Sequence, residues 1–121
     1  MTGRRHHDLR VWQDGIALVK AIYLLSGRLP RDEQFGLTSQ LRRAAVSVPT
    51  NIAEGAARST RNEFLQFLTI ARGSLSEIDT LLIVCAEVGH LSPAELEPVQ
   101  KQVHSLLGGL GSLIKQQREQ S

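Results

Sequence analysis

The sequence contains one cysteine, five aromatic residues and no long hydrophobic run, and each shortage excludes a class of protein. A single cysteine cannot form an internal disulfide, which argues against a disulfide-stabilised scaffold and fits a reducing cytoplasm. The longest uncharged apolar run, residues 81–86, is far shorter than the roughly 20 residues that cross a bilayer. A chain of 121 residues has room for one substantial core. We therefore expect a single-domain cytoplasmic protein that does not span a membrane.

Motifs for catalysis and metal binding are also scarce. His6, His7, His90 and His104 have no His or Cys partner one helical turn away on a shared helix. Nothing in the sequence resembles a phosphate-binding loop or a nucleophile elbow. Cys85 falls within an apolar stripe and is expected to be a small core residue. We therefore expect a non-catalytic protein without a cofactor or a metal site.

Four apolar stripes at helical spacing predict helices over residues 9–28, 33–58, 61–88 and 93–117. No segment alternates with period two for long enough to indicate a strand. The fold class that follows is all-α, an antiparallel up-down-up-down four-helix bundle that forms one domain over residues 1–121. The stripes are, in chain order, Leu9, Trp12, Ile16, Val19 and Tyr23; Leu37, Leu41, Ala44, Val48 and Ile52; Phe64, Leu68, Ala71, Leu75, Ile78, Leu82 and Cys85; and Leu96, Val99, Val103, Leu106, Leu110 and Leu113.

The expected helix ends follow from capping residues and from glycine. Pro49 lies inside the second stripe, where a missing backbone donor predicts a kink. The polar tail after Lys115 is expected to be loose. The expected cap residues are Asp8 for the first helix, Asp32 or Thr38 for the second, Thr60 with Glu63 for the third and Ser92 with Glu95 for the fourth.

The helices carry more apolar and small residues than one narrow seam needs. A second apolar edge in the first helix comprises Val11, Leu18 and Leu25, which indicates a broad core or a subunit interface. Gly inside a helix costs about 1 kcal/mol relative to Ala, so a cluster in the fourth helix needs a reason. Either a neighbouring helix approaches closely there or the helix frays. In the first case a candidate oligomer interface contains Ser105, Gly108, Gly109 and Ser112.

Positive charge concentrates in the first part of the chain. Residues 1–72 contain 11 basic and 6 acidic residues, whereas residues 73–121 contain 3 basic and 6 acidic residues. Most of the basic residues are arginines, which suit bidentate contact with phosphate or carboxylate. The imbalance indicates either an anionic partner such as nucleic acid or attraction between oppositely charged parts of neighbouring subunits.

A polar strip follows the second helix at 100° per residue. It could be a ridge that binds the phosphates of a nucleic acid. It could equally be a subunit contact, with Asn51 and Glu54 as candidate oligomer-interface residues and an arginine pairing with Glu54. The members of the strip are Arg43, Ser47, Asn51, Glu54, Arg58 and Arg61.

Several motifs closely resemble the bacterial four-helix-bundle proteins of the 23S rRNA intervening-sequence family. Residues 35–58 (FGLTSQLRRAAVSVPTNIAEGAAR) include LRRAA and a Pro-x-Asn-x-x-Glu-Gly run. Residues 64–91 (FLQFLTIARGSLSEIDTLLIVCAEVGHL) include Gly-Ser-Leu, and residues 8–13 (DLRVWQ) match the family's N-terminal signature. The resemblance covers roughly residues 6–118.

The resemblance implies a ring-like homopentamer whose cellular role is largely unassigned. The family is also similar to the accessory variability proteins of diversity-generating retroelements, which are basic pentameric bundles that engage a reverse transcriptase and nucleic acid. By this analogy the candidate nucleic-acid-binding residues are Arg42, Arg43, Arg58 and Arg61, and a reverse transcriptase is a candidate partner. Two hypotheses follow, an oligomeric protein that binds RNA or DNA, or a structural adaptor whose arginines serve subunit contacts or a protein partner.

Overall fold

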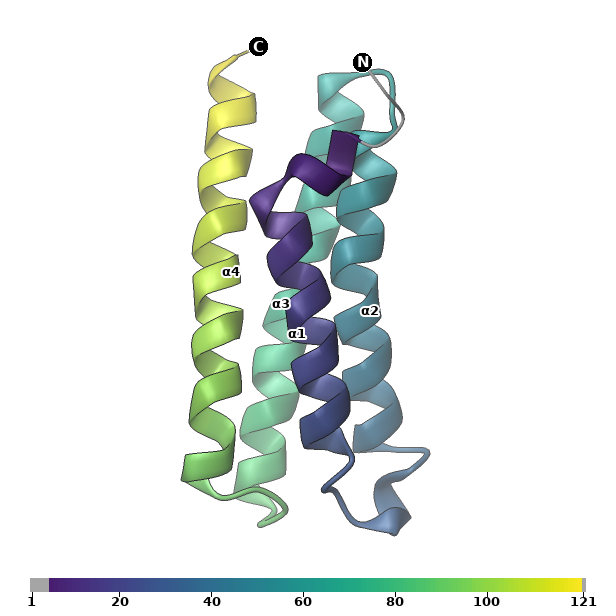
Figure 1. Cartoon of the computed structure of the whole chain (residues 1–121), viewed down its shortest axis with the longest axis vertical. Helices are drawn as coiled ribbons and strands as arrows, with labels where there is room; N and C mark the ends of the chain where they lie inside the picture. The colour runs from purple at the N-terminus through teal and green to yellow at the C-terminus, as the bar shows by residue number, and fades with distance from the viewer. Residues whose placement is uncertain (1–4, 121) are drawn as a thin grey trace.

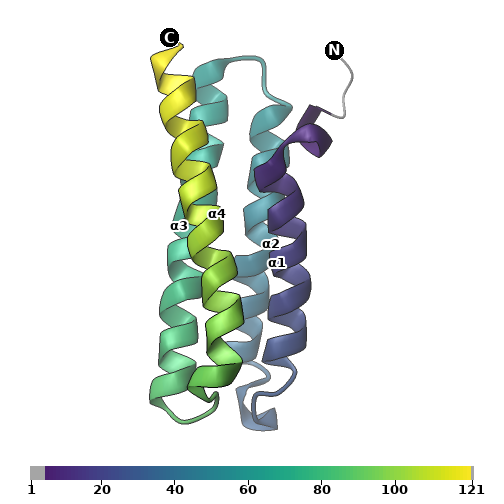
Figure 2. The same cartoon turned by 60° about the vertical axis from the view of Figure 1, so that its left-hand side comes forward.

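A computed structural model describes residues 5–120, and four α-helices account for most of this range. Figures 1 and 2 show that successive helices run in opposite directions, which confirms the expected all-α four-helix bundle. The α2–α3 connection and the end of α4 lie at one end of the bundle, and the other two connections lie at the opposite end. No helix within residues 5–120 is long and apolar enough to cross a membrane. The elements are η1 (Arg5–Asp8), α1 (Arg10–Ser26), η2 (Arg31–Glu33), α2 (Leu37–Ala56), α3 (Arg61–Glu87) and α4 (Pro93–Glu119).

The predicted stripes of α2, α3 and α4 supply most of the core. All seven stripe residues of α3 are buried, and so are those of α2 except the half-buried Leu37. In α4, Ile114 is the last buried residue of the stripe, whereas Leu113, the predicted last member, is only half-buried. The expectation of a loose tail after Lys115 is wrong, because α4 continues to Glu119. The helix is also continuous through its glycines, so fraying does not explain them.

The predicted core face of α1 is wrong. Ile16 and Tyr23 remain 46% and 43% exposed, because α1 turns its second apolar edge toward the core. At 100° per residue the predicted and buried faces lie about 120° apart. Leu9 occupies the N-cap position in place of Asp8, and its side chain has no oxygen that could accept a capping hydrogen bond. The buried residues are Val11, Gly15, Leu18, Ile22, Leu25 and Ser26.

The caps of α3 and α4 are confirmed, whereas those expected for α2 are wrong. Thr60 accepts a hydrogen bond from the backbone nitrogen of Glu63 at 3.2 Å, and Ser92 forms a complete capping box. Gly36, rather than Asp32 or Thr38, occupies the N-cap position of α2. The backbone nitrogen of the next residue, Leu37, donates to Glu33 Oε1 at 3.3 Å. A carboxylate at a helix N-terminus stabilises its unpaired N–H groups.

Two buried glycines allow the helices to approach closely. A Cβ added at Gly15 would lie 3.4 Å from Pro49 Cβ, so α1 crosses α2 directly over the proline. The helical hydrogen-bonding pattern of α2 continues on both sides of Pro49. A Cβ added at Gly55 would lie 2.7 Å from Phe67 Cβ and 3.1 Å from Phe64 Cδ1. The spacing of α2 and α3 therefore requires glycine at residue 55.

Replacing Gly55 with alanine is expected to cost about 1–3 kcal/mol through overpacking of the core. The 2.7 Å approach places the cost in the upper part of this range, so a net loss of about 1–2 kcal/mol remains after the gain of about 1 kcal/mol that alanine brings to a helix interior. Gly73→Ala is the matched control, since no described atom lies within 4 Å of its added Cβ, and it should be neutral or stabilising. Urea unfolding of both variants would measure the two effects. Equal stability of the two variants would contradict the close contact.

Candidate functional site

The polar strip lies along the seam between α2 and α3. The Ser47 hydroxyl donates to Ala44 O at 2.8 Å, and a hydrogen bond of 2.5 Å joins it to the hydroxyl of Ser74 on α3. The Asn51 amide donates to Ser47 O at 2.7 Å. The strip was extrapolated along one straight helix. Because α2 ends at Ala56 and Arg61 belongs to α3, it is divided between two helices and their connection. The centre of the strip therefore joins α2 to α3 within the chain.

Arg42 stands apart from the other candidate arginines, on the α1 side of α2. Its Nε donates to Ser26 Oγ at 2.9 Å and its Nη2 to Tyr23 O at 3.3 Å. The guanidinium carbon also lies 4.6 Å from the centroid of the Tyr23 ring, within the range of a cation–π contact. Arg42 therefore ties α2 to the last turn of α1, where a cation is favoured by the helix dipole.

Arg43 and Arg58 lie beside the α2–α3 seam, whereas Arg61, at the start of α3, reaches toward the end of α4. Arg43 donates to the hydroxyl of Ser39 at 3.0 Å. Arg58 pairs with Glu54 at 2.9 Å and lies 5.0 Å from the centroid of the Phe67 ring. Arg61 donates to the backbone oxygen of Gln120, near the end of α4.

The candidate interface on α4 divides between two environments. A Cβ added at Gly109 would lie 3.2 Å from Val11 Cγ1, so the approach of α1 explains this glycine within one chain. Around Gly108, by contrast, no atom of residues 5–120 lies within 4 Å of the added Cβ. Ser105 and Ser112 are exposed on the same side of α4. The small outward face of α4 therefore has no explanation within the described part of the chain.

An apolar groove of about 520 Å³ between α1 and α2 was not predicted. Three of its residues, Trp12, Ile16 and Val19, belong to the stripe that was assigned to the core of α1, so a signal for the groove was present in the sequence. Val46, on the α2 side, is 41% exposed, so apolar side chains from both helices reach the surface. The apolar residues that line the groove are Trp12, Ile16, Val19, Val46, Pro49 and Ala53.

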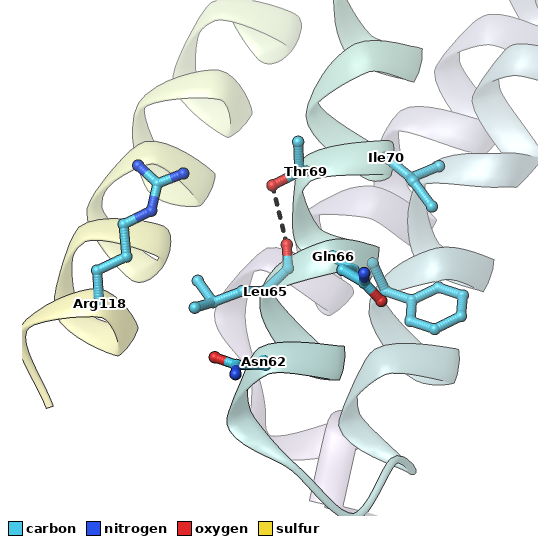
Figure 3. Close-up of a pocket in the computed structure, with 7 residues that line it drawn as sticks. Asn62, Leu65, Gln66, Thr69, Ile70 and Arg118 are labelled. Carbon is cyan, nitrogen blue, oxygen red and sulfur yellow. Dashed lines mark hydrogen bonds between the residues drawn. The ribbon is translucent and has the colours of Figure 1, made fainter. Parts of the chain in front are cut away.

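A second hollow, of about 790 Å³, lies on the outer side of α3 and reaches α4 (Figure 3). Asn62 and Gln66 contribute side-chain amides, and Leu65 and Ile70 contribute apolar surface. Figure 3 shows Arg118 of α4 on the opposite side of the hollow from Ile70. This hollow was not predicted, because two amide residues one helical turn apart form no sequence pattern that marks a site.

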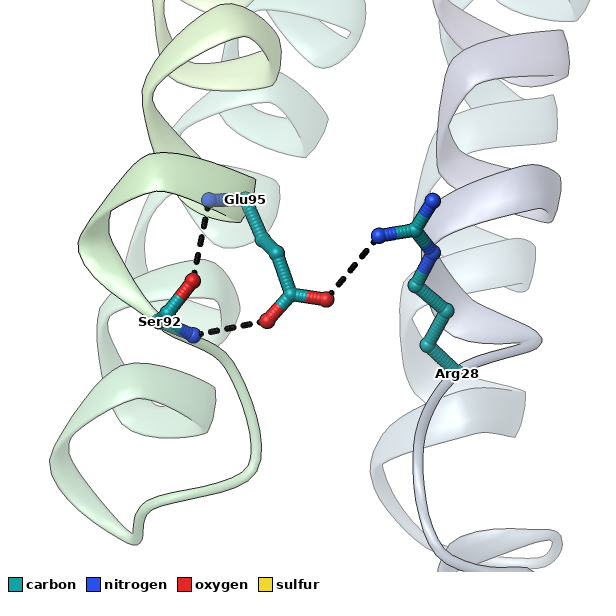
Figure 4. A network of polar contacts seen from close by, with 3 residues as sticks. All are labelled: Arg28, Ser92 and Glu95. Carbon is teal, nitrogen blue, oxygen red and sulfur yellow. Dashed lines mark hydrogen bonds and ion pairs between the residues drawn. The ribbon is translucent and has the colours of Figure 1, made fainter.

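The opposite end of the bundle is closed by charged groups. Arg28, just after α1, pairs with Glu95 of α4 at 3.0 Å, and Glu95 also accepts from the backbone nitrogen of Ser92 (Figure 4). His90 Nε2, after α3, lies 2.9 Å from Glu33 Oε2. Gly89 ends α3 with a φ of 84°, which glycine adopts readily. These contacts connect both loops at this end.

The contacts of the two carboxylates change their acidity. The pKa of Glu33 is lowered by its hydrogen bond to His90 and then by the one from the backbone nitrogen of Leu37. The pKa of Glu95 is lowered by the backbone hydrogen bond from Ser92 and then by Arg28. Burial raises the pKa of the Cys85 thiol, as suits a core residue.

The other histidines contact aromatic or acidic neighbours. His6 and His7 lie against the Trp12 ring, at centroid distances of 5.2 and 4.7 Å. His104 lies 3.2 Å from Asp79 on α3. Among residues 5–120, no three His, Cys, Asp or Glu side chains come together as a metal site would require.

Glu33→Gln is expected to reduce the loss of stability on acidification. A carboxyl group with a lowered folded pKa stabilises the fold above its ordinary pKa, here 4.5, and this stability is lost as the pH falls through the folded value. Glutamine keeps the size of the side chain but does not titrate. The difference in melting temperature between pH 6 and pH 3 should therefore be smaller in the variant. Glu97→Gln, which removes an exposed pair with Lys101, is the control and should follow the parent protein.

Comparison with known proteins places the chain in a family. Residues 7–112 match the 23S rRNA-intervening sequence protein family. The fold is similar to the crystal structure of a protein of unknown function from the S23 ribosomal protein family of Bacteroides thetaiotaomicron VPI-5482. The TM-score is 0.81 at 22% sequence identity, over 87% of this chain and 95% of the other. No curated protein matches the chain. The chain therefore belongs to the 23S rRNA-intervening sequence protein family.

Proposed function

We propose that this protein is a non-enzymatic homo-oligomer, pentameric as the family resemblance implies, that binds RNA or DNA through the phosphate backbone. The observation that carries the proposal is the row of arginines beside the α2–α3 seam. From Arg43 to the end of α2 at Ala56 the helical rise is about 20 Å, which corresponds to about six phosphates of one strand, and Arg58 follows two residues later. Arg61 extends the row across the α2–α3 connection.

Assembly is supported by surfaces that a lone subunit leaves open. The apolar groove between α1 and α2 and the small outward face of α4 lie on different helices. Two different surfaces suit a ring, in which each copy offers one surface to each neighbour. The RNA context in the family's name agrees with a ribonucleoprotein role. A reverse transcriptase partner, implied by the similarity to accessory variability proteins, belongs to the same proposal.

Reversing two charges in the arginine row should weaken nucleic-acid binding. With Arg58→Glu and Arg61→Glu together, we expect at least tenfold weaker binding to a structured RNA at 0.1 M salt. The slope of affinity against salt should fall by about two, since two phosphate contacts are lost. Fluorescence anisotropy across a salt series measures both quantities.

The control for this experiment reverses two charges elsewhere. Arg10→Glu with Lys101→Glu makes the same change in net charge on the α1–α4 side and should bind more strongly than the first variant. Sedimentation should give the parental mass for both. Equal losses in the two variants would contradict a localised phosphate-binding row. If Arg58→Glu with Arg61→Glu lowers the melting temperature, Arg58→Gln with Arg61→Gln takes its place, since it removes both positive charges without adding negative ones.

A structural adaptor for a protein partner is the second candidate function. It is favoured by the contacts of Arg42 and Arg58, which already engage Ser26, Tyr23 and Glu54 within the chain. Under this alternative, the protein binds no nucleic acid even at low salt. Reversal of Arg58 and Arg61 then changes the oligomer mass or lowers the melting temperature.

Gly108→Leu should reduce the oligomer mass without destabilising the subunit. A Cβ at residue 108 has no described atom of another part of the chain within 4 Å, and leucine favours the helix by up to about 1 kcal/mol over glycine. Analytical ultracentrifugation with thermal melting separates the two effects. Gly73→Leu, at another exposed glycine without a described neighbour within 4 Å, is the matched control. An unchanged mass for Gly108→Leu would remove the outward face of α4 from the interface.

A further inference from the structure

We infer that the hollow on the outer side of α3 is a nucleobase subsite for single-stranded RNA or DNA. The inference rests on the proposed nucleic-acid binding and adds a contact to the bases, where the arginine row contacts phosphates. The hollow is a surface depression of about 790 Å³, open to solvent, and combines amide, apolar and cationic side chains (Figure 3). This combination matches a nucleotide, which has a polar edge, apolar faces and a negative charge.

The amides suit the edge of a base. Asn62 and Gln66 are four residues apart on α3, so both side chains lie on the same face of the helix. Both residues are exposed, and each amide offers a donor and an acceptor to a ligand. Asn and Gln recognise adenine through such paired hydrogen bonds, and exposed bases of single strands present their other edges in the same way.

The surroundings of the amides suit the faces of a base. Leu65 and Ile70 line the hollow, and Phe67 adds an aromatic ring. Phe67 is half-buried against α2 near Gly55, and the Arg58 guanidinium lies 5.0 Å from its ring centroid. Stacking on an aromatic side chain contributes to binding of every base and needs no particular sequence.

The cations around the hollow suit the phosphates that flank a bound base. Arg118 lines it on the α4 side, and Arg58 lies 5.0 Å from the Phe67 centroid on the α2 side. Arg61 directly precedes Asn62 in the chain. A strand that follows the arginine row can therefore place a base over α3 without leaving the row. Paired bases inside a duplex are stacked against their neighbours, so the subsite selects single strands.

The test compares two oligonucleotides of equal length and charge, an adenine octamer and an octamer of abasic sites. We expect the parent protein to bind the adenine octamer at least fivefold more tightly at 0.1 M salt. Asn62→Ala with Gln66→Ala should at least halve this preference, the rest coming from stacking on Phe67, while leaving the affinity for the abasic octamer unchanged. Gln34→Ala, an exposed amide at the opposite end of the bundle, is the control and should keep the full preference.

The outcomes separate the inference from the proposed function. Equal binding of the two octamers by the parent protein would overturn the subsite, and phosphate binding would stand. A preference of unchanged size in the double variant would also overturn it, because the amides would then make no contact with the base. Binding of neither octamer, at any salt concentration, would overturn both. A reduced preference in the double variant alone, with an unchanged melting temperature, supports the subsite.

Discussion

The close packing of α2 against α3 at Gly55 is the constraint on which the rest of the structure depends. It brings the backbone of α2 against Phe67, and further along the seam it allows Ser47 to reach Ser74. The seam therefore has a narrow, polar exterior on which arginines from both helices are displayed. A wider separation would open the core and place Arg58 beyond the reach of the Phe67 ring. The same contact thus serves stability and the shape of the candidate binding surface.

Charged side chains act mainly at the ends of the helices. At one end, Glu33 caps α2 and contacts His90, while Glu95 caps α4 and pairs with Arg28. At the other end, Arg61 donates to a backbone oxygen near the end of α4. The two carboxylates lie at helix N-termini and the Arg61 guanidinium at the C-terminus of α4, where the dipoles of α2 and α4 favour these charges. The ends of the bundle are therefore held by electrostatics, and its middle by apolar packing.

The sequence predicted the helices and most of the core because α2, α3 and α4 each have one dominant apolar stripe. The core face of α1 could not be predicted, since α1 has two apolar stripes and periodicity does not rank them. Gly15 distinguishes the stripes, because a residue without a side chain marks the side where α1 meets Pro49. The arginine strip was predicted only in part, since a straight extrapolation of α2 cannot show where the helix ends. The hollow on α3 is also lined by Arg118 of α4. The sequence of α3 alone does not show which residue of another helix lies beside it.

The difference between the two ends of the bundle has a consequence for local unfolding. At the end that contains Glu33 and Glu95, side-chain contacts join the α1–α2 connection both to the α3–α4 connection and to the start of α4. Gly89, with its positive φ, forms the turn after α3. Segments with few such contacts open first and exchange their amide hydrogens fastest. We expect exchange to begin at the opposite end, in the last turns of α4 and the first turn of α3. The hollow lies at that end, so a bound strand would slow exchange where the free protein opens most readily.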